Sequence, residues 1–234
     1  MRKVLITGAG TGIGLACTQK FLKNGWTVIA HFNRSSGHLE KLKSYKSRLM
    51  TYQADFRQSS DVLRFLDFVK QQTLMGLVNN AALYDFSTQE KNRIQAIKDV
   101  LAVNAMVPAL IAEVVFKKMC AKREGHIVNI SSIAAKYGSS RDHIFYGISK
   151  RGLEALTRTL AREGAAFNIC VNTIRPGVVS TDFHKKIKKN MSERKSLIPM
   201  KRFAQPSEVA DLVYYLCHGN KFMTNQILTI AGGE

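Results

Sequence analysis

The chain has few prolines and few cysteines for its 234 residues, four of each. No Pro-rich or Ser-rich linker interrupts it, so one domain over residues 1–234 is expected. The cysteines are scattered, with no C-x-x-C pair and no cluster of Cys and His. Such spacing argues against zinc or another bound metal and is typical of reduced thiols in the cytoplasm. The four residues are Cys17, Cys120, Cys170 and Cys217.

Long hydrophobic runs are also missing. No apolar stretch approaches the ~20 residues that a membrane-spanning helix needs. The first residues, Met1–Gly8, enter a strand-like pattern at once, and their apolar run is too short for a secretion signal. Hydrophobic residues make up 45% of the chain, an ordinary value for a globular protein. These features predict a cytoplasmic globular protein with no membrane partner.

Acidic residues are scarce, because 17 Asp and Glu stand against 35 Lys and Arg and give a net charge of +18. Net charge bears on partners and association rates, not on fold. Part of the excess is gathered in residues 181–202, where the regular pattern of the chain is interrupted. We expect residues 181–203 to form a lid, or substrate segment, over a site. The basic residues of this segment are Lys185, Lys186, Lys188, Lys189, Arg194, Lys195, Lys201 and Arg202.

A basic cluster of this kind suits an anionic partner, and nucleic acid is the first class to weigh. The chain has no recognisable helix-turn-helix, RNP-type aromatic motif or zinc finger. Few aromatic side chains stand among the lysines, so bases would find little to stack on. Binding of nucleic acid is therefore not expected as the primary role.

Short β-rich runs alternate with amphipathic stretches along the whole chain. The alternation predicts βαβ units, hence an α/β domain with a doubly wound parallel sheet of about seven strands and helices on both faces. Several strands are apolar on both sides, as a covered parallel sheet requires. The predicted strands are 4–7, 27–32, 49–53, 76–79, 126–130, 169–174 and 226–230, and the predicted helices are 12–24, 37–46, 59–72, 90–121, 146–166 and 206–217.

A glycine-rich turn, Thr7–Gly14, follows the first predicted strand and opens a helix. Its glycines let the main chain approach a pyrophosphate, and the helix offers its N-terminal amides. This context predicts a dinucleotide site. In such sites an acidic residue at the end of the second strand usually holds the ribose 2′-hydroxyl. The segment Ala30–Arg34 has no carboxylate, and Arg34 would attract a 2′-phosphate, so NADPH is favoured over NAD. The alternative for Arg34 is a solvated loop residue.

Tyr146 and Lys150 stand one helical turn apart, and Ser132 lies upstream of both. An ammonium beside a phenol favours the phenolate and lowers the pKa of the tyrosine from its usual ~10. A tyrosine tuned in this way can act as a general acid or base near neutral pH. Downstream of a nucleotide-binding turn, the pair indicates an enzyme that transfers a proton beside a bound dinucleotide.

Together these motifs resemble the short-chain dehydrogenase/reductase family over essentially the whole chain, which implies a Rossmann-type fold. Asn104, Ser132, Tyr146 and Lys150 match the catalytic tetrad of the family. The resemblance implies an NADPH-dependent oxidoreductase in which Ser132 orients a carbonyl and Tyr146 protonates its oxygen. Lys150 would lower the pKa of Tyr146 and hold the nicotinamide ribose, and Asn104 would stabilise a water leading to bulk solvent. The implied cofactor-binding residues are Gly8, Gly10, Thr11, Gly12, Ile13, Gly14, Asn33, Arg34, Asp55, Phe56, Asn80, Ala81, Tyr146, Lys150, Pro176, Gly177, Val179 and Thr181.

Within the family, Ile198–Ala210 and Ile230–Gly233 look most like 3-oxoacyl-[acyl-carrier-protein] reductases, enzymes of fatty acid biosynthesis. Acyl carrier proteins are acidic, so the basic segment 181–202 would speed their encounter with the site. Arg123 falls at a position where these reductases carry a carrier-binding arginine. Phe167 stands at a second such position and departs from the pattern.

Other interpretations remain open. Arg141–Tyr146 and Gln53–Phe56 resemble pteridine-reducing members, so a pteridine-type or other small-ketone reductase is the alternative. A dinucleotide sensor without catalysis is the non-enzymatic one. A homotetramer or homodimer is expected, because Gly152, Ala155 and Thr159 form a stripe of small residues on one predicted helix. The same stripe could instead pack on the chain's own sheet.

Overall fold

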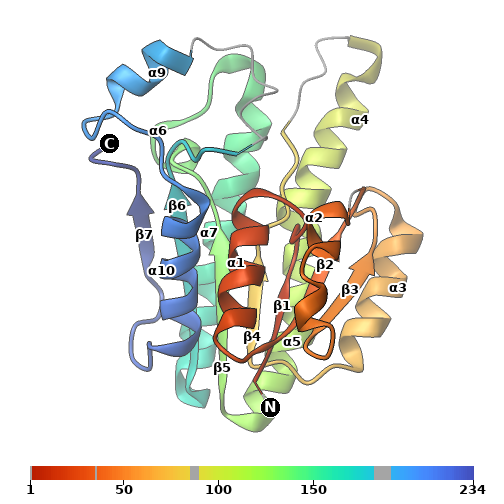
Figure 1. Ribbon diagram of the computed structural model, residues 1–234. Helices are drawn as coiled ribbons and strands as arrows, with labels where there is room; N and C mark the ends of the chain where they lie inside the picture. The colour runs from red at the N-terminus through yellow and green to blue at the C-terminus, as the bar shows by residue number, and fades with distance from the viewer. Residues whose placement is uncertain (1, 35, 85–89, 182–190) are drawn as a thin grey trace.

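The computed structural model describes residues 2–34, 36–84, 90–181 and 191–234, which form one seven-stranded sheet (Figure 1). All neighbouring strands are parallel, in the order β3-β2-β1-β4-β5-β6-β7. The order reverses between β1 and β4, which is the mark of a doubly wound sheet. The predicted fold and its strands are confirmed. The strands are β1 (Lys3–Ile6), β2 (Thr27–Phe32), β3 (Leu49–Gln53), β4 (Gly76–Asn79), β5 (Gly125–Ile130), β6 (Ile169–Pro176) and β7 (Ile227–Ile230).

Helices cover both faces of the sheet. Helices α1 and α10 pack on one face, and α3, α5 and α7 pack on the other (Figure 1). The helices are α1 (Gly12–Lys23), α2 (Gly37–Glu40), α3 (Ser59–Lys70), α4 (Glu90–Leu101), α5 (Val107–Lys122), α6 (Ala134–Tyr137), α7 (Ile144–Gly164), α9 (Met191–Leu197) and α10 (Pro206–His218).

The helix predictions were correct for the long amphipathic stretches and wrong for the short ones. The stretch 90–121 is present as α4 and α5, joined by a π-helical segment, Ala102–Met106. The stretch 37–46 contains only the single turn of α2 and a 3₁₀ turn at Lys43–Tyr45. Helices α6 and α9 were not predicted, because elements of one or two turns carry too few residues for a helical period to be recognised.

The core lies in two layers, one on each face of the sheet. Adjacent strand residues enter opposite layers, as Val4 and Leu5 of β1 do. In β4 and β5 every residue is buried. This explains why the central strands are apolar at successive positions instead of alternating with polar residues.

One helical stretch, Asn92–Lys122, is long and apolar enough by composition to cross a membrane. The expectation from the sequence concerned uninterrupted apolar runs, and Asn104 and Glu113 divide those of this stretch. In the fold, Val107, Ile111, Val115 and Met119 of this stretch belong to the core. They recur every four residues and so share one face of α5. Packing of that face on the sheet accounts for the apolar composition.

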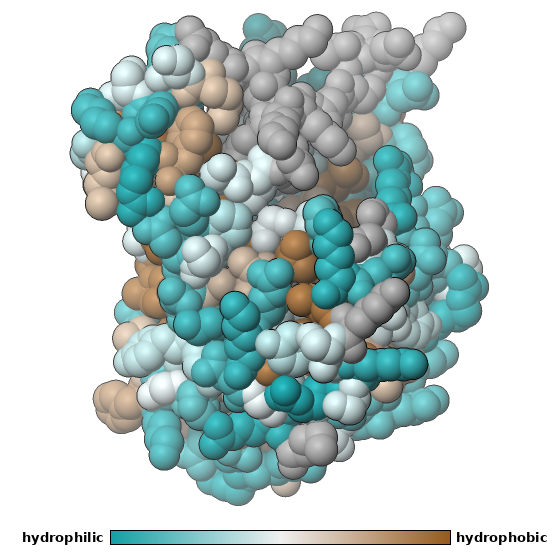
Figure 2. All heavy atoms as spheres, viewed as in Figure 1, coloured by the Kyte–Doolittle hydropathy of each residue, from teal (hydrophilic) through white to brown (hydrophobic). Residues whose placement is uncertain are grey.

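The carboxyl ends of the central strands meet at one edge of the sheet, toward the top of Figure 1. Ligands of doubly wound sheets bind at this edge, near the point where the strand order reverses. Figure 2 shows a mainly hydrophilic surface on the side of α1 and α10, with hydrophobic atoms exposed near the middle of the view. The loops after β1, β4, β5 and β6 therefore define the region in which a site is expected.

Candidate active site

The glycine turn after β1 lies tightly against the loop after β4. Gly8 has a φ of +64°, and a Cβ built on it would lie 2.9 Å from the Cα of Ala81. A Cβ on Gly14 would lie 2.1 Å from the carbonyl oxygen of Gly8. Because both positions exclude a side chain, the start of α1 and the turn can approach each other, and no side chain of Gly8 or Gly14 stands between this main chain and a phosphate group.

Side chains of the neighbouring segments hold this turn. The amide of Asn80 donates hydrogen bonds to the carbonyl oxygens of Thr7 (2.9 Å) and Gly8 (3.1 Å). The hydroxyl of Thr7 in turn accepts hydrogen bonds from the main-chain N–H groups of Asn80 and Ala81, each at 3.0 Å. The turn is therefore fixed to β4 before any ligand binds.

His31, at the end of β2, supports the same turn and was missed by the sequence analysis. The N–H of Gly8 donates to its Nδ1 at 3.2 Å, and its Nε2 lies 3.0 Å from the carbonyl oxygen of Ala54. Since Nδ1 accepts, Nε2 must carry the proton and donate to Ala54. The ring stacks on Phe56, with centroids 4.0 Å apart. Burial lowers the pKa of His31 from 6.5 to about 4, so the ring is neutral near pH 7.

A pocket that would take the adenosine end of a dinucleotide opens beside the turn, and we call it the adenosine pocket. Predicted cofactor residues that line it include Gly10, Asn33, Arg34 and Phe56, and Arg57 lines it as well. Arg34 is exposed, and no carboxylate is present at this end of β2. The pocket therefore offers two guanidinium groups, one of which the sequence analysis did not indicate.

Asp55, predicted to contact adenine, is engaged by the protein itself. The Nε of Arg57 donates to its Oδ1 at 2.9 Å, and Nη2 of the same guanidinium contacts Oδ2. This hydrogen bonding lowers the pKa of the Asp55 carboxyl. Asp55 does not line the pocket, whereas Phe56 and Arg57 do. Its carboxylate orients Arg57, and contact with adenine stays a prediction.

A second pocket continues from the first, and Gly8, Thr11 and Ala81 line both, so that together they form one groove. The second pocket brings together most of the remaining predicted residues. They are Gly12, Ile13, Asn80, Ser132, Tyr146, Lys150, Pro176, Gly177, Val179 and Thr181. Of the predicted set, Gly14, Asp55 and Asn104 line neither pocket. A continuous groove of two pockets, with a glycine-rich turn where they join, fits a dinucleotide.

Tyr146 and Lys150 project from the first turns of α7 into this groove. Both are buried, with exposed fractions of 8% and 2%. The ammonium of Lys150 donates to the carbonyl oxygen of Ile130 at 2.9 Å and lies 5.7 Å from the centroid of the Tyr146 ring. Burial lowers the pKa of Lys150 from 10.5 to about 8, so the ammonium is still mostly charged near pH 7.

The expected effect of Lys150 on Tyr146 is not realised in this structure. Burial raises the pKa of Tyr146 to about 12, and a hydrogen bond with Ser132 opposes this rise in part. Desolvation of the phenolate dominates because the ammonium is directed toward Ile130 instead of the phenol oxygen. Tyr146 is therefore protonated near neutral pH, which is the state that a proton donor requires.

Ser132 and Asn104 are fixed by main-chain partners. The hydroxyl of Ser132 accepts a hydrogen bond from the N–H of Ala134 at 3.1 Å. Asn104 lies in the π-helical segment, and its Nδ2 donates to the carbonyl oxygen of Leu83 (2.8 Å) and to the hydroxyl of Ser149 (3.1 Å). Both N–H groups of the amide are thus engaged. Asn104 joins the loop after β4 to α7, and its predicted role in holding a water stays a prediction.

A further pocket adjoins Tyr146 and Ser132 on the side away from the glycine turn. Tyr84 and Tyr137 line it, and so do Arg194 of α9 and Glu234. The ring centroids of Tyr84 and Tyr146 are 4.8 Å apart. The guanidinium of Arg194 pairs with the Glu234 carboxylate at 2.6 Å. This position, next to the proton donor, is where a substrate would enter.

The predicted lid and carrier-binding residues are only partly brought to this site. Residues 182–190, with four of the basic cluster's lysines, lie outside the described residues. Arg194 and Arg202 are paired with Glu234 and Glu208. Arg123 lies two residues before β5, at the end of the sheet opposite the groove, with its guanidinium 5.6 Å from the Phe167 ring centroid. It is therefore not part of the groove, and its role in binding a carrier stays a prediction.

Comparison with known proteins shows the family of the chain. A family model described as short chain dehydrogenase matches residues 2–192. The chain belongs to the short-chain dehydrogenase family. It is similar to L-xylulose reductase of Caenorhabditis elegans, with 33% identity over 99% of this chain and 95% of the relative. It is also similar to a 3-oxoacyl-[acyl-carrier-protein] reductase of Thermotoga maritima, with 31% identity over 98% of this chain and 96% of the relative.

Solved structures show the same fold. A short-chain dehydrogenase/reductase family protein superposes with a TM-score of 0.85 at 26% identity, covering 99% of this chain and 96% of the other. Levodione reductase superposes with a TM-score of 0.87 at 24% identity, covering 99% and 96%. The short-chain dehydrogenase family uses an NAD(P) cofactor, and this chain is an oxidoreductase of that family.

Proposed function

We propose that this protein is an NADPH-dependent reductase that converts a carbonyl group to an alcohol. The observation that carries the proposal is a set of three side chains at the end of the groove, a half-buried serine with a buried tyrosine and a buried lysine. Tyr146 is hydrogen-bonded to Ser132, and Lys150 follows one turn later on α7. This arrangement can deliver a proton to a carbonyl oxygen without involving bulk water.

The residues divide the chemistry between them. A bound nicotinamide would supply the hydride that the carbonyl carbon needs. Tyr146, protonated because burial raises its pKa, donates its proton to the carbonyl oxygen. The hydroxyl of Ser132 hydrogen-bonds the same carbonyl oxygen and orients it. Lys150 holds positive charge beside the phenol, which stabilises the phenolate left after proton transfer.

The substitution Tyr146→Phe tests this role because it removes the hydroxyl and keeps the ring. Loss of a general acid costs about 10²–10⁴-fold in rate, so NADPH oxidation should fall by that factor. The dissociation constant for NADPH, measured by fluorescence, should change less than about twofold. The matched control is Tyr215→Phe, on the exposed face of α10. Full turnover by Tyr146→Phe would show that another group is the proton donor.

The preferred coenzyme in this proposal is NADPH. Arg34 and Arg57 both line the adenosine pocket, and the end of β2 has no carboxylate to repel a 2′-phosphate. A guanidinium binds a phosphate through two parallel hydrogen bonds, which suits this position. The other cofactor contacts and the tetrad roles are proposed as the sequence analysis gives them.

The proposed substrate is a 3-oxoacyl thioester, which would place the enzyme in fatty acid biosynthesis or a related pathway. Support comes from relatives named as 3-oxoacyl-[acyl-carrier-protein] reductases at 29–32% identity. A carrier protein could be attracted by the basic segment 181–202, although Arg123 lies at the other edge of the sheet. Turnover with acetoacetyl thioesters, free and carrier-bound, tests this assignment.

A small ketone or a dihydropteridine is the second candidate substrate. The pocket beside Tyr146 is lined by the aromatic rings of Tyr84 and Tyr137, which favour a flat molecule. L-xylulose reductase, a relative that acts on a sugar by its name, is similar at 33% identity. The same NADPH oxidation assay with dihydropteridines and simple ketones distinguishes this class from thioesters.

We also propose that the enzyme assembles as a homodimer or homotetramer in the cytoplasm. Gly152, Ala155 and Thr159 are all exposed on α7, so the stripe does not pack on the chain's own sheet. The neighbouring Ile148 and Met106 are 50% and 54% exposed, which gives this face an apolar character. A second copy would cover the face through a two-fold contact. Light scattering would report the mass of the assembly.

A further inference from the structure

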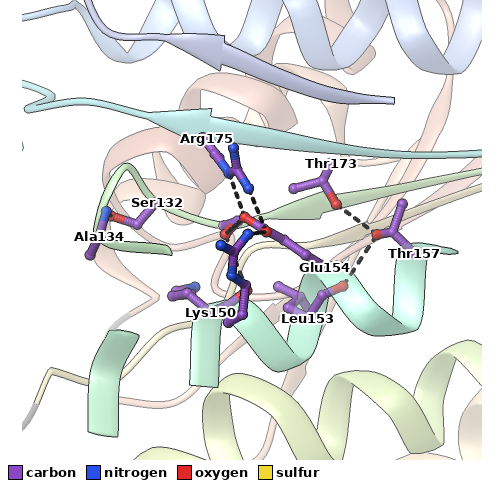
Figure 3. Close-up of polar contacts among 10 residues, drawn as sticks. Ser132, Ala134, Lys150, Leu153, Glu154, Thr157, Thr173 and Arg175 are labelled. Carbon is purple, nitrogen blue, oxygen red and sulfur yellow. Dashed lines mark hydrogen bonds and ion pairs between the residues drawn. The ribbon is translucent and has the colours of Figure 1, made fainter. Parts of the chain in front are cut away.

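A buried acidic side chain lies directly behind the catalytic residues and is not used by the proposed chemistry. Glu154 on α7 is 1% exposed. Its Oε1 accepts hydrogen bonds from the Ser131 hydroxyl (2.9 Å) and from Nε of Arg175 (2.6 Å). Its Oε2 accepts from Nη2 of Arg175 (2.7 Å) and from Nη1 of Arg151 (3.0 Å). Figure 3 shows the guanidinium of Arg175 reaching down to Glu154.

This carboxylate joins three chain segments that each carry part of the site. Ser131 directly precedes Ser132 on the loop after β5, and Arg175 directly precedes Pro176 at the end of β6. Glu154 itself lies one helical turn after Lys150 on α7. A single side chain therefore fixes the spacing of the serine, the lysine and the segment that lines the nicotinamide end of the groove.

Ser131 also connects Glu154 to Lys150. The hydroxyl of Ser131 lies 3.2 Å from the carbonyl oxygen of Lys150. The ammonium of Lys150 donates to the carbonyl oxygen of Ile130, the residue before Ser131. If Ser131 moves, the acceptor that holds the Lys150 ammonium moves with it. The position of that charge relative to the phenol therefore depends on Glu154.

Attachment of α7 to the sheet does not need Glu154. One turn further along, the hydroxyl of Thr157 accepts a hydrogen bond from Nδ2 of Asn129 at 2.7 Å. It also lies 2.6 Å from the hydroxyl of Thr173, as Figure 3 shows. These contacts already tie α7 to β5 and β6. Leu153 and Leu160 of the same helix are buried. The hydrogen bonds of Glu154 are therefore additional to the contacts that hold α7 on the sheet.

A charged cluster is also a poor way to stabilise a core. Burial opposes ionisation of Glu154, but hydrogen bonds from Arg175, Ser131 and Arg151 outweigh it and lower the pKa of the carboxyl. Desolvation of both partners consumes most of the attraction in a buried ion pair, and apolar residues of similar volume are often as stable or more so. What the pair supplies that apolar residues cannot is a fixed, directional geometry.

We propose that Glu154 is a positioning residue, whose carboxylate holds in register the three segments that line the nicotinamide end of the groove. The inference rests on the proposed function, because it concerns the same groove. Glu154 is expected to affect only the nicotinamide end of that groove. The adenosine end is built from the turns after β1 and β2, and in the described part of the chain no hydrogen bond of Glu154 reaches these turns.

The double variant Glu154→Leu/Arg175→Met removes both buried charges and leaves neither unpaired. Its affinity for NADPH should fall about five- to tenfold, the effect of losing about one well-placed hydrogen bond. Its affinity for 2′,5′-ADP, which occupies only the adenosine end, should change less than about twofold. Isothermal titration measures both constants, and thermal unfolding shows that the variant is folded at the assay temperature.

The control is Asp67→Asn/Lys70→Met, which removes an exposed ion pair of α3 and should alter neither affinity. Unchanged affinities in the Glu154 variant, with only the melting temperature altered, would show a purely structural role and overturn the proposal. Equal losses for both ligands would indicate a general distortion and overturn it as well. Failure of the proposed function is distinguishable, because the unsubstituted protein would then reduce no carbonyl substrate with NADPH, a result that does not depend on the double variant.

Turnover gives a second readout once a carbonyl compound that the enzyme reduces is found. Misplacement of a reacting group by about 1 Å can cost about 10²-fold in rate. The double variant should therefore lose about 10–100-fold in kcat at saturating NADPH, with KM for the carbonyl substrate changed less than about threefold. A loss confined to KM would assign Glu154 to substrate binding and contradict the positioning role.

Discussion

The main-chain N–H of Gly8 donates its hydrogen bond to the neutral ring of His31, at 3.2 Å. The bond joins the turn that would hold the pyrophosphate to the neighbouring strand β2. The same ring donates to the carbonyl oxygen of Ala54 after β3 and stacks on Phe56. One imidazole thus links three strand ends of the adenosine site, and it can do so only while it is neutral, because protonated Nδ1 cannot accept.

Stability should therefore fall in mildly acidic solution. The folded protein keeps His31 neutral down to about pH 4, whereas the unfolded chain takes up a proton near pH 6.5. Stability from this group is complete above pH 6.5 and is lost as the pH falls toward 4, because the unfolded state then binds more protons. The difference between the two values corresponds to about 3 kcal/mol. Urea unfolding between pH 7.5 and 4 measures it.

The variant His31→Gln separates this effect from other groups. A glutamine amide can accept from Gly8 and donate to Ala54 without titrating. It should keep NADPH binding within about threefold at pH 7 and lose less stability between pH 6.5 and 4 than the parent protein does. His31→Leu, which can make neither bond, should weaken NADPH binding. An identical acid dependence in the parent and the glutamine variant would rule out His31 as the source.

Coenzyme preference gives a prediction for the two arginines of the adenosine pocket. A hydrogen bond to a charged group contributes about 1.5–3 kcal/mol, so Arg34→Ala should weaken NADPH about 10–100-fold. NADH, which has no 2′-phosphate, should bind nearly as before. Arg57→Ala should act in the same direction, because Asp55 holds Arg57 at the same pocket. The measurement is the ratio of the two dissociation constants by fluorescence.

Arg64→Ala is the control, because Arg64 is 68% exposed on α3, pairs with Asp61 and does not line the adenosine pocket. It should change neither constant. Equal weakening of NADPH and NADH by Arg34→Ala would mean that Arg34 contacts a part shared by both coenzymes. In that case the preference for NADPH would have to come from Arg57 or be absent.

Local patterns explain which features could be predicted from sequence. The strands, the glycine turn, and the pair Tyr146 and Lys150 are each recognisable within a few consecutive residues. Glu154 and Arg175 are 21 positions apart and belong to no local motif, so only the folded chain shows that they meet. His31 left a weaker signal, a lone imidazole in an apolar strand, which is found as often for packing as for binding.

Electrostatic predictions failed where they depended on burial. The spacing of Tyr146 and Lys150 correctly puts both on one face of α7, but it cannot show that the ammonium turns to Ile130. Nor can it show how much water the groove excludes, which is what raises the pKa of Tyr146. Arg123 is a different case. Its position in the sequence gives no indication that it lies at the end of the sheet opposite the site, and its role in carrier binding stays a prediction.

The buried ammonium of Lys150 should lower the free energy of unfolding near pH 7. Burial lowers its pKa from 10.5 to about 8, so below pH 8 the folded state holds an unfavourable charge. The lowering corresponds to about 3 kcal/mol, and the hydrogen bond to Ile130 returns about 1 kcal/mol. Between pH 8 and 10.5 the unfolded chain binds more protons than the folded one, so stability from this group rises with pH in that range.

Lys150→Met replaces the buried ammonium by an apolar side chain of similar length. A net gain of about 2 kcal/mol should raise the melting temperature by about 4–8 °C at pH 7. Turnover should be lost, because the charge that stabilises the Tyr146 phenolate is gone. Calorimetry at pH 7 and pH 10 checks the first effect, which should shrink at the higher pH as the parent lysine loses its proton.

The comparison with Lys20→Met shows whether burial of the charge causes the rise in melting temperature. Lys20 on α1 is 37% exposed and pairs with Asp211 on the surface, so its replacement should change the melting temperature little. If Lys150→Met lowers the melting temperature instead, the charged lysine contributes more to the folded state than its burial costs. The ammonium would then have partners beyond Ile130, and the assignment of its lowered pKa to desolvation would be wrong.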